Sequence, residues 1–319
     1  MEIKQFKVLS TPQKNELFDF IKNTDLTYNK SYVEMIRIYE SDTFNYGDTV
    51  FILFHQGEIK GSVAIITKEI INVGEAFITD IYVEKKNEEK YLCFLIEEVT
   101  KYCSICSARS IKIGIRKNEI QLIPYINKME FTHIYDAMVM RYRKGENMLS
   151  RVKNDMELMP LCISNSLEYM NIHNEAFKNS PNGATIDELE VKDYIVQYAN
   201  NEELIGICFD KEKPCGIYEL SIDGSIGWID TLAIVPSYQN MSLGKSLLLE
   251  CIKKLYEENL EEVKLLVITS NDVALHLYRG FGFKEEYVFS YWFEKKIKFS
   301  EKVLYLDNLH IIMKLDTDT

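Results

Sequence analysis

The chain has 319 residues, of which 46% are hydrophobic and 27% are charged, the balance of an ordinary globular protein long enough for two domains. Its net charge of −12 disfavours nucleic acid or an anionic membrane as a partner bound through overall charge, although a local basic patch is compatible with it. An acidic surface mildly favours a cationic substrate such as an amine, but it also serves solubility.

Apolar periodicity and turn residues predict the elements of the first half of the chain. Thr11 is expected to cap a helix whose first turn contains Pro12. Pro124 falls inside the helix that follows Asn118 and is expected to kink it. The predicted strands are 3–9, 50–55, 62–71, 76–83 and 131–142, and the predicted helices start at Thr11 and span 30–39 and 88–103.

The polar, glycine-containing stretch 143–147 is the best candidate for a linker. We therefore expect two domains, 1–145 and 146–319, with strand 131–142 closing the first. In the second half, a turn at Lys213-Pro214 is expected to separate two strands. The predicted strands there are 157–163, 203–209, 216–222, 226–236, 263–268, 286–293 and 309–315, and the predicted helices run from 165 or 166 to 178, from 185 or 187 to about 198, from 243 through 255, and onward from Asn271.

The same unit occurs twice along the chain. Asn118 and Asn271 each follow a short β-branched strand, and each precedes a tyrosine, Tyr125 or Tyr278, by seven residues. A repeat this long indicates duplicated domains. The strands before them that also match are 78–83 and 229–234.

The cysteines and the start of the chain bear on the compartment. Seven cysteines is an odd number, so reduced thiols in a cytoplasmic protein are expected. Cys103 and Cys106 have the spacing of a metal or redox pair, but no second pair or histidine cluster accompanies them, so we expect no metal site. The first residues carry no apolar signal core, and no apolar run is long enough to span a bilayer.

Residues 226–255 read as a strand, a short polar loop and a helix. The first N–H groups of a helix lack partners and carry partial positive charge, so this helix start is a candidate anion site. Ser242 and Gly244 leave the backbone accessible, and Lys245 and Ser246 supply further donors.

Two motifs of the second half resemble those of one family. Residues 239–244, Gln-Asn-Met-Ser-Leu-Gly, resemble the Q/R-x-x-G-x-G/A motif of the GCN5-related N-acetyltransferases (GNAT), with Ser242 in place of the first glycine. Residues 271–283 resemble the family's second signature, N-x-x-A-x-x-x-Y-x-x-x-G-F. The resemblance implies an α/β (α+β) fold of two tandem GNAT-like domains. Each would be a mixed, mostly antiparallel twisted sheet flanked by helices, with splayed parallel strands in the C-terminal unit.

The resemblance also implies an acetyl-CoA site. In the family, the splayed strands admit the pantetheine arm and the loop binds the pyrophosphate. In the first half, the corresponding corner at 84–90 has no glycine and carries two carboxylates, so that unit is expected to be degenerate and not to bind the cofactor in this way. The implied cofactor-binding residues are Leu232, Ala233, Ile234, Gln239, Asn240, Met241, Ser242, Leu243, Gly244, Lys245, Ser246, Asn271, Ala274, Leu277 and Tyr278.

The implied reaction is direct acyl transfer from the thioester to an amine. A free backbone N–H near Ile234 would stabilise the oxyanion. The resemblance places Tyr278 where it would protonate the leaving thiolate. Trp228 stands at the position of the family's glutamate base, and Asp230, two residues on and on the same strand face, is our candidate base. Weaker candidates for the base are His173, His276 and Glu219.

The predicted function is therefore an N-acetyltransferase that moves an acetyl group from acetyl-CoA to a primary amine and acts through its C-terminal domain. A non-catalytic acyl-CoA-binding or regulatory protein is the alternative. A transferase that uses aminoacyl-tRNA is a third reading, which the acidic charge disfavours. The acceptor, a small-molecule or peptide amine, is not readable from the sequence. We expect no nucleic acid or membrane partner, and a homodimer is a possible assembly.

Overall fold

The structure is a computed structural model that describes residues 1–143, 156–178, 180, 183, 185–258 and 260–297. Contacts within the chain divide it into two compact units. Of the described residues, those of 1–134 and 291–297 form unit 1 and those between 135 and 290 form unit 2. This division differs from the predicted domains 1–145 and 146–319, because each half of the chain contributes a strand to the other unit.

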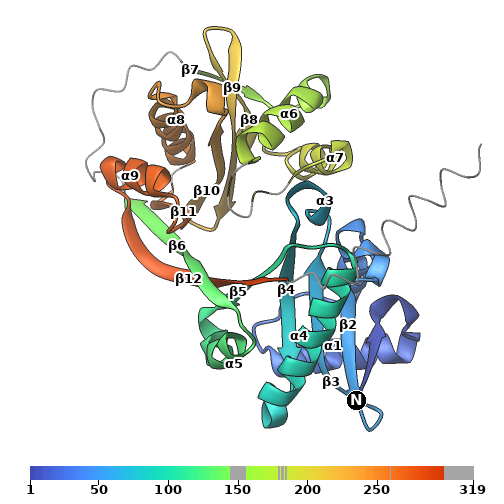
Figure 1. The fold of residues 1–319 in the computed structure, drawn as a ribbon. Helices are drawn as coiled ribbons and strands as arrows, with labels where there is room; N and C mark the ends of the chain where they lie inside the picture. The colour runs from blue at the N-terminus through green and yellow to red at the C-terminus, as the bar shows by residue number, and fades with distance from the viewer. Residues whose placement is uncertain (144–155, 179, 181–182, 184, 259, 298–319) are drawn as a thin grey trace, which may run out of the picture. The chain divides into compact units, whose positions relative to one another are not determined.

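The strands of unit 1 follow the order β1-β2-β3-β4-β5-β12, and β12 contributes to this unit only its residues from Tyr291 on (Figure 1). Strands β4 and β5 pair in parallel, whereas β1 to β4 form antiparallel neighbours. The strands are β1 (Glu2–Gln5), β2 (Val50–His55), β3 (Glu58–Ile66), β4 (Glu75–Val83), β5 (Ser110–Arg116) and β12 (Lys284–Lys296). The helices are α1 (Thr11–Thr24), α2 (Tyr32–Tyr39), α3 (Ile70–Val73), α4 (Glu88–Ile105) and α5 (Ile123–Lys128).

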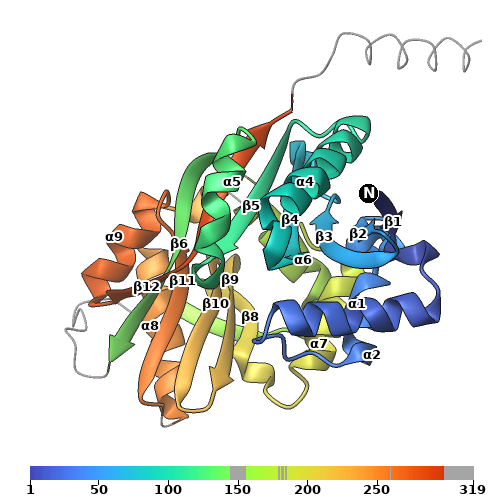
Figure 2. The same cartoon turned by 90° about the horizontal axis from the view of Figure 1, so that it is seen from below.

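Both faces of this sheet are covered, and the side chains of β2 alternate between two cores. Phe51 and Leu53 join the core that contains α4. Val50, Ile52 and Phe54 join the core that contains residues of α1 and α2. Figure 2 shows α4 on one side of β2 and β3 and α1 on the other. Strand β2 therefore needs apolar residues at successive positions, rather than an alternation of apolar and polar residues.

Unit 2 repeats the plan in the order β6-β11-β10-β9-β8-β7, with α6 and α7 on one side of β8 to β10 and α8 on the other (Figure 1). Strands β10 and β11 pair in parallel, as β4 and β5 do in unit 1. The strands are β6 (Thr132–Arg143), β7 (Met156–Pro160), β8 (Ile205–Asp210), β9 (Lys213–Asp223), β10 (Ile226–Ile234) and β11 (Glu262–Ile268), and the helices are α6 (Ser166–Phe177), α7 (Glu188–Gln197), α8 (Leu243–Glu257) and α9 (Asp272–Phe281).

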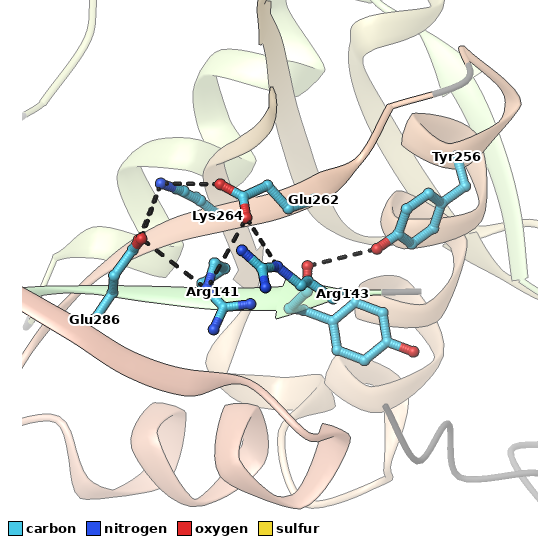
Figure 3. A network of polar contacts seen from close by, with 7 residues as sticks. Arg141, Arg143, Tyr256, Glu262, Lys264 and Glu286 are labelled. Atoms are coloured by element: carbon cyan, nitrogen blue, oxygen red, sulfur yellow. Dashed lines mark hydrogen bonds and ion pairs between the residues drawn. The ribbon is translucent and has the colours of Figure 1, made fainter. Parts of the chain in front are cut away.

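Strand β6 belongs to the sheet of unit 2 and does not close the first unit as predicted. Its residues 137–143 pair antiparallel with 262–268 of β11. Polar side chains follow the register on one face (Figure 3): Lys264 Nζ lies 3.1 Å from Glu262 and 3.0 Å from Glu286, and Arg143 Nε lies 3.3 Å from Glu262. The basic and acidic side chains alternate across three strands, so the strand predicted at 131–142 is confirmed, but it pairs with β11 of unit 2.

The end of β12 makes the reverse contribution. Its residues from Tyr291 on belong to unit 1. There Thr132 Oγ1 donates to the carbonyl of Glu294 at 3.3 Å, and the N–H of Ile297 donates to the carbonyl of Arg109 at 2.9 Å. The two halves of the chain have therefore exchanged their last strands.

Several local predictions need correction. The strand predicted at 3–9 ends at Gln5, and a 3-10 turn, Phe6–Val8, buries the ring of Phe6. Ser10, not Thr11, is the N-cap of α1, because its side chain and that of Gln13 form a capping box. Thr11 is therefore the first residue inside the helix rather than its cap.

Two prolines lie elsewhere than expected. Pro124 is in the first turn of α5, where its missing N–H needs no partner, so it causes no kink. Pro214 lies within β9, and the turn before it is formed by Lys211 and Glu212, both at positive φ. The predicted strand 62–71 ends at Ile66, and residues 70–73 form α3. Residues 144–147 of the predicted linker and the predicted strand 309–315 lie outside the described residues.

Candidate functional site

Strands β10 and β11 separate part-way along their length. They pair in parallel only from Ile226↔Glu262 to Ile229↔Leu265, although each strand continues beyond. The register of β10 with β9 shifts between Ile229 and Thr231, which places Asp230 at a β-bulge. The predicted splaying of these strands is confirmed.

The backbone beyond the bulge keeps a partner on one side only. Leu232, Ala233 and Ile234 pair with β9, and among the described residues none of them pairs with β11. The carbonyl of Ile234 also accepts a hydrogen bond from Gln239 Nε2 at 3.0 Å, so the loop side chain closes the end of the strand. The N–H of Val235 donates to the carbonyl of Cys215 on the β9 side, so by alternation Ala233 also faces β9, and the N–H and C=O of Leu232 and the N–H of Ile234 are the groups available to an extended ligand.

Helix α8 begins without a side-chain cap. Its N-cap residue, Ser242, has φ +64° and makes no capping hydrogen bond, whereas Asp187 caps α7 and Asn271 caps α9. The Ser242 carbonyl accepts from the N–H of Lys245 at 3.0 Å, which closes the first turn. Open N–H groups at a helix start favour an anion.

Gly244 brings three elements of the site together. A Cβ built on it would lie 3.8 Å from Leu277 of α9 and 4.0 Å from Ile234 of β10. The end of the strand, the start of α8 and the inner face of α9 therefore meet at this glycine. Met241 is exposed, and among the described residues Lys245 forms no ion pair.

The second signature folds as the helix α9. The side chain of Asn271 accepts from the N–H of Ala274 at 3.1 Å, so its capping role is direct. Tyr278 is buried, and burial raises its pKa to about 12, with a smaller contribution from Cys251. Its ring packs 5.8 Å from that of Phe283, and its hydroxyl makes no hydrogen bond within the described chain. Tyr278 therefore holds its proton at neutral pH.

Two carboxylates lie at the bulge. Asp230 is exposed when the residue is taken as a whole, but its carboxyl group is partly buried, and this burial raises its pKa. A hydrogen bond from Ser221 partly offsets the rise. Glu219, on β9 opposite Thr231, is half-buried, and burial raises its pKa. Tyr198 Oη donates to it at 3.1 Å and Thr231 Oγ1 at 3.2 Å.

The structure places Glu219 beside Asp230. The sequence ranked Glu219 below Asp230 as a candidate base, because spacing along β10 alone favours Asp230. Only the pairing Thr231↔Glu219 brings this side chain to the bulge. The two candidate histidines lie on helices: His173 on α6 packs 4.7 Å from the ring of Phe177, and His276 lies on α9. The sequence did contain an indication that Glu219 has a functional role, because this acidic residue interrupts the run of buried residues in β9.

The corresponding corner of unit 1 differs in its charges. Strands β4 and β5 also pair over four residues and then separate. Glu88 and Glu89 occupy the first turn of α4. An open pocket of about 450 Å³ lies at this corner, and Tyr125 of α5 is among its lining residues together with three lysines. That this unit does not bind acetyl-CoA stays a prediction.

Three general features concern the cysteines, metal ligands and membrane-spanning helices. All seven cysteines are free thiols. Within the described residues, no group of three or more His, Cys, Asp or Glu side chains is placed to hold a metal ion. In that same part of the chain, no helix is long and apolar enough to cross a membrane.

Comparison with known proteins agrees with this geometry. Residues 168–283 match the family model described as the acetyltransferase (GNAT) family. The GCN5-related N-acetyltransferase from Sphaerobacter thermophilus has a similar structure, with a TM-score of 0.63 at 14% identity over 93% of this chain and 96% of that one. No curated protein matches the chain in sequence.

Two further structures share the fold over most of this chain. A tandem GNAT protein from the clavulanic acid biosynthesis pathway aligns with a TM-score of 0.58 and 9% identity, over 94% of this chain and 99% of that one. A GCN5-related N-acetyltransferase from Anabaena variabilis aligns with a TM-score of 0.64 and 10% identity, over 93% and 73%. Residues 168–283 of this chain thus match the GNAT acetyltransferase family, and the chain has the fold of a tandem GNAT protein over most of its length.

Proposed function

We propose that the chain is an acetyl-CoA-dependent N-acetyltransferase whose chemistry is carried out by unit 2. The observation that carries the proposal is the early end of the β10–β11 pairing beside an uncapped helix start. An opening between strands suits an extended pantetheine arm, and open helical N–H groups suit a pyrophosphate. The residues we assign to the cofactor are those predicted from the sequence, centred on Ala233, Ser242 and Gly244.

The bound cofactor supplies an acetyl thioester, and the chain supplies the groups around it. Tyr278 holds a proton at Oη, and its raised pKa favours hydrogen-bond donation toward the departing sulfur over full proton transfer. Asp230, exposed at the bulge, is the base we assign to the incoming amine. Its raised pKa brings it closer to the working range of a base at neutral pH.

Titration of CoA into the full chain tests the cofactor site. Lys245→Glu places a negative charge in the first turn of α8, where it stabilises the helix but repels a pyrophosphate. Lys253→Glu makes the same charge change two turns further along the same helix and is the matched control. We expect a tenfold or greater loss of CoA affinity in the first variant and less than twofold in the second.

Two results would contradict the proposal. If the wild-type chain binds no CoA, the function is wrong. If both lysine variants bind CoA equally well, the loop is not the pyrophosphate site. Turnover of acetyl-CoA with a panel of amines then separates an enzyme from a non-catalytic acyl-CoA-binding protein, and Asp230→Asn should remove the acid limb of its pH profile.

A further inference from the structure

We propose that Glu219 binds the ammonium group of the acceptor, in a subsite walled by Tyr169, Tyr194 and Tyr198. The inference rests on the proposed function and adds the acceptor class, a cationic amine of the alkylammonium type. All four side chains belong to unit 2.

Neutral donors fix the carboxylate in place. Tyr198 follows α7 and donates to Oε1 of Glu219, and Thr231 of β10 donates to Oε2. Each carboxylate oxygen has further lone-pair capacity beyond the single donor that it receives. The group is therefore oriented but not saturated.

The carboxylate lacks a counterion. Among the described residues, neither Glu219 nor the nearby Asp230 forms an ion pair with a lysine, arginine or histidine. Asp230 adds a second negative charge beside Glu219. A carboxylate that has lost solvent without gaining a cation is costly, and a bound ammonium would remove that cost.

Unit 1 contains a similar arrangement with two cations nearby. Tyr39, at the end of α2, donates to Asp80 Oδ2 at 3.2 Å, as Tyr198 does to its carboxylate. Lys30 and Arg116 lower the pKa of Asp80 against the effect of burial. A tyrosine–carboxylate bond between the second helix and the sheet thus occurs in both units. Burial raises the pKa of both carboxylates, but Lys30 and Arg116 lie near Asp80, whereas no cation of the described residues acts on Glu219.

Tyr169 gives an independent indication of a ligand. Its side chain is fully buried on α6, and its hydroxyl has no hydrogen-bond partner among the described residues. Glu219 is the charge that most strongly affects this phenol, after burial itself. The ring lies 6.5 Å from that of Tyr194 at 80°, so two aromatic rings stand beside the carboxylate. Aromatic rings and a free phenol oxygen both favour an ammonium ion.

Binding without an acyl donor tests the subsite directly. The full chain is titrated calorimetrically with n-butylammonium chloride and with 1-butanol, a neutral molecule of similar shape. We expect the cation to bind at least tenfold more tightly. Glu219→Gln should abolish this preference, since a hydrogen bond to a charged group contributes about tenfold or more. Asp80→Asn is the matched control in unit 1 and should retain the preference.

A second variant guards against a folding defect. Tyr169→Phe removes a buried hydroxyl that has no partner among the described residues, so it should leave the fold unchanged or more stable, yet weaken n-butylammonium binding several-fold. The proposal is overturned if the wild type binds the two probes equally, or if neither Glu219→Gln nor Tyr169→Phe changes the preference. Failure of CoA binding would contradict the proposed function and leave the result of this titration standing.

Discussion

Ser242 is a non-glycine residue in the left-handed region, at φ +64°, and this strain is measurable. Such a conformation costs an L-residue about 1–2 kcal/mol. Glycine removes that cost, but it gains about 0.5–1 kcal/mol of unfolded-chain entropy. We therefore expect Ser242→Gly to raise the free energy of unfolding by about 0.5–1 kcal/mol. Asn240 has the same φ and is the control, because asparagine tolerates this region.

Urea unfolding followed by tryptophan fluorescence is the assay. The chain has two tryptophans, Trp228 in unit 2 and Trp292 in unit 1, so a Trp292→Phe background makes Trp228 the reporter of the unit that carries the loop. With a slope of about 2 kcal/mol per molar urea, Ser242→Gly should raise the midpoint by about 0.3 M. A midpoint at or below that of the parent, together with an increase for Asn240→Gly, would refute the strain argument.

Three other perturbations have defined outcomes. Asp187→Ala removes acceptors for two N–H groups of α7, at 2.8 and 3.0 Å, and should cost about 1 kcal/mol in the same urea assay, whereas exposed Asp193→Ala should cost almost nothing. The raised pKa of Tyr278 contributes stability that is fully present below about pH 10 and is lost as the pH rises through about 12. Tyr278→Phe should therefore reduce the loss of stability at alkaline pH. The same variant should lower kcat about 100-fold, because it removes the proton donor. Lys264→Met removes the cation that Glu262 and Glu286 share and leaves Glu262 only its arginine partners, so it should lower stability by about 2 kcal/mol; an unchanged urea midpoint would contradict a net stabilising role for the Lys264 ion pairs.

Local signals in the sequence were enough for the site's backbone. The polar loop before Leu243 predicted the helix start, and Asn271 predicted the cap of α9, because both depend on neighbours within a few residues. The splaying of β10 and β11 was predicted from the family resemblance alone, because the apolar periodicity of the sequence carries no information about where two strands separate.

The sequence did not show which strands pair with one another when they lie far apart in the chain. The alternation of residues 131–142 identified a strand but not its partner, because the same inward and outward pattern suits either sheet. Glu219 was undervalued for the same reason, since its place beside Thr231 depends on register across two strands. Charge complementarity between Arg141 or Arg143 and Glu262, the one acidic residue of β11, was present in the sequence, but it is recognisable only once the strands are aligned.

The exchanged strands have a consequence for biosynthesis. The first unit needs residues of β12, which is synthesised after the other described strands, so it cannot complete its sheet while the second unit is still being made. A chain cut between 145 and 146 would leave the seven residues of β11, Glu262–Ile268, as an open edge in the C-terminal fragment. Each fragment produced alone should therefore aggregate, whereas the two produced in the same cell should rescue one another.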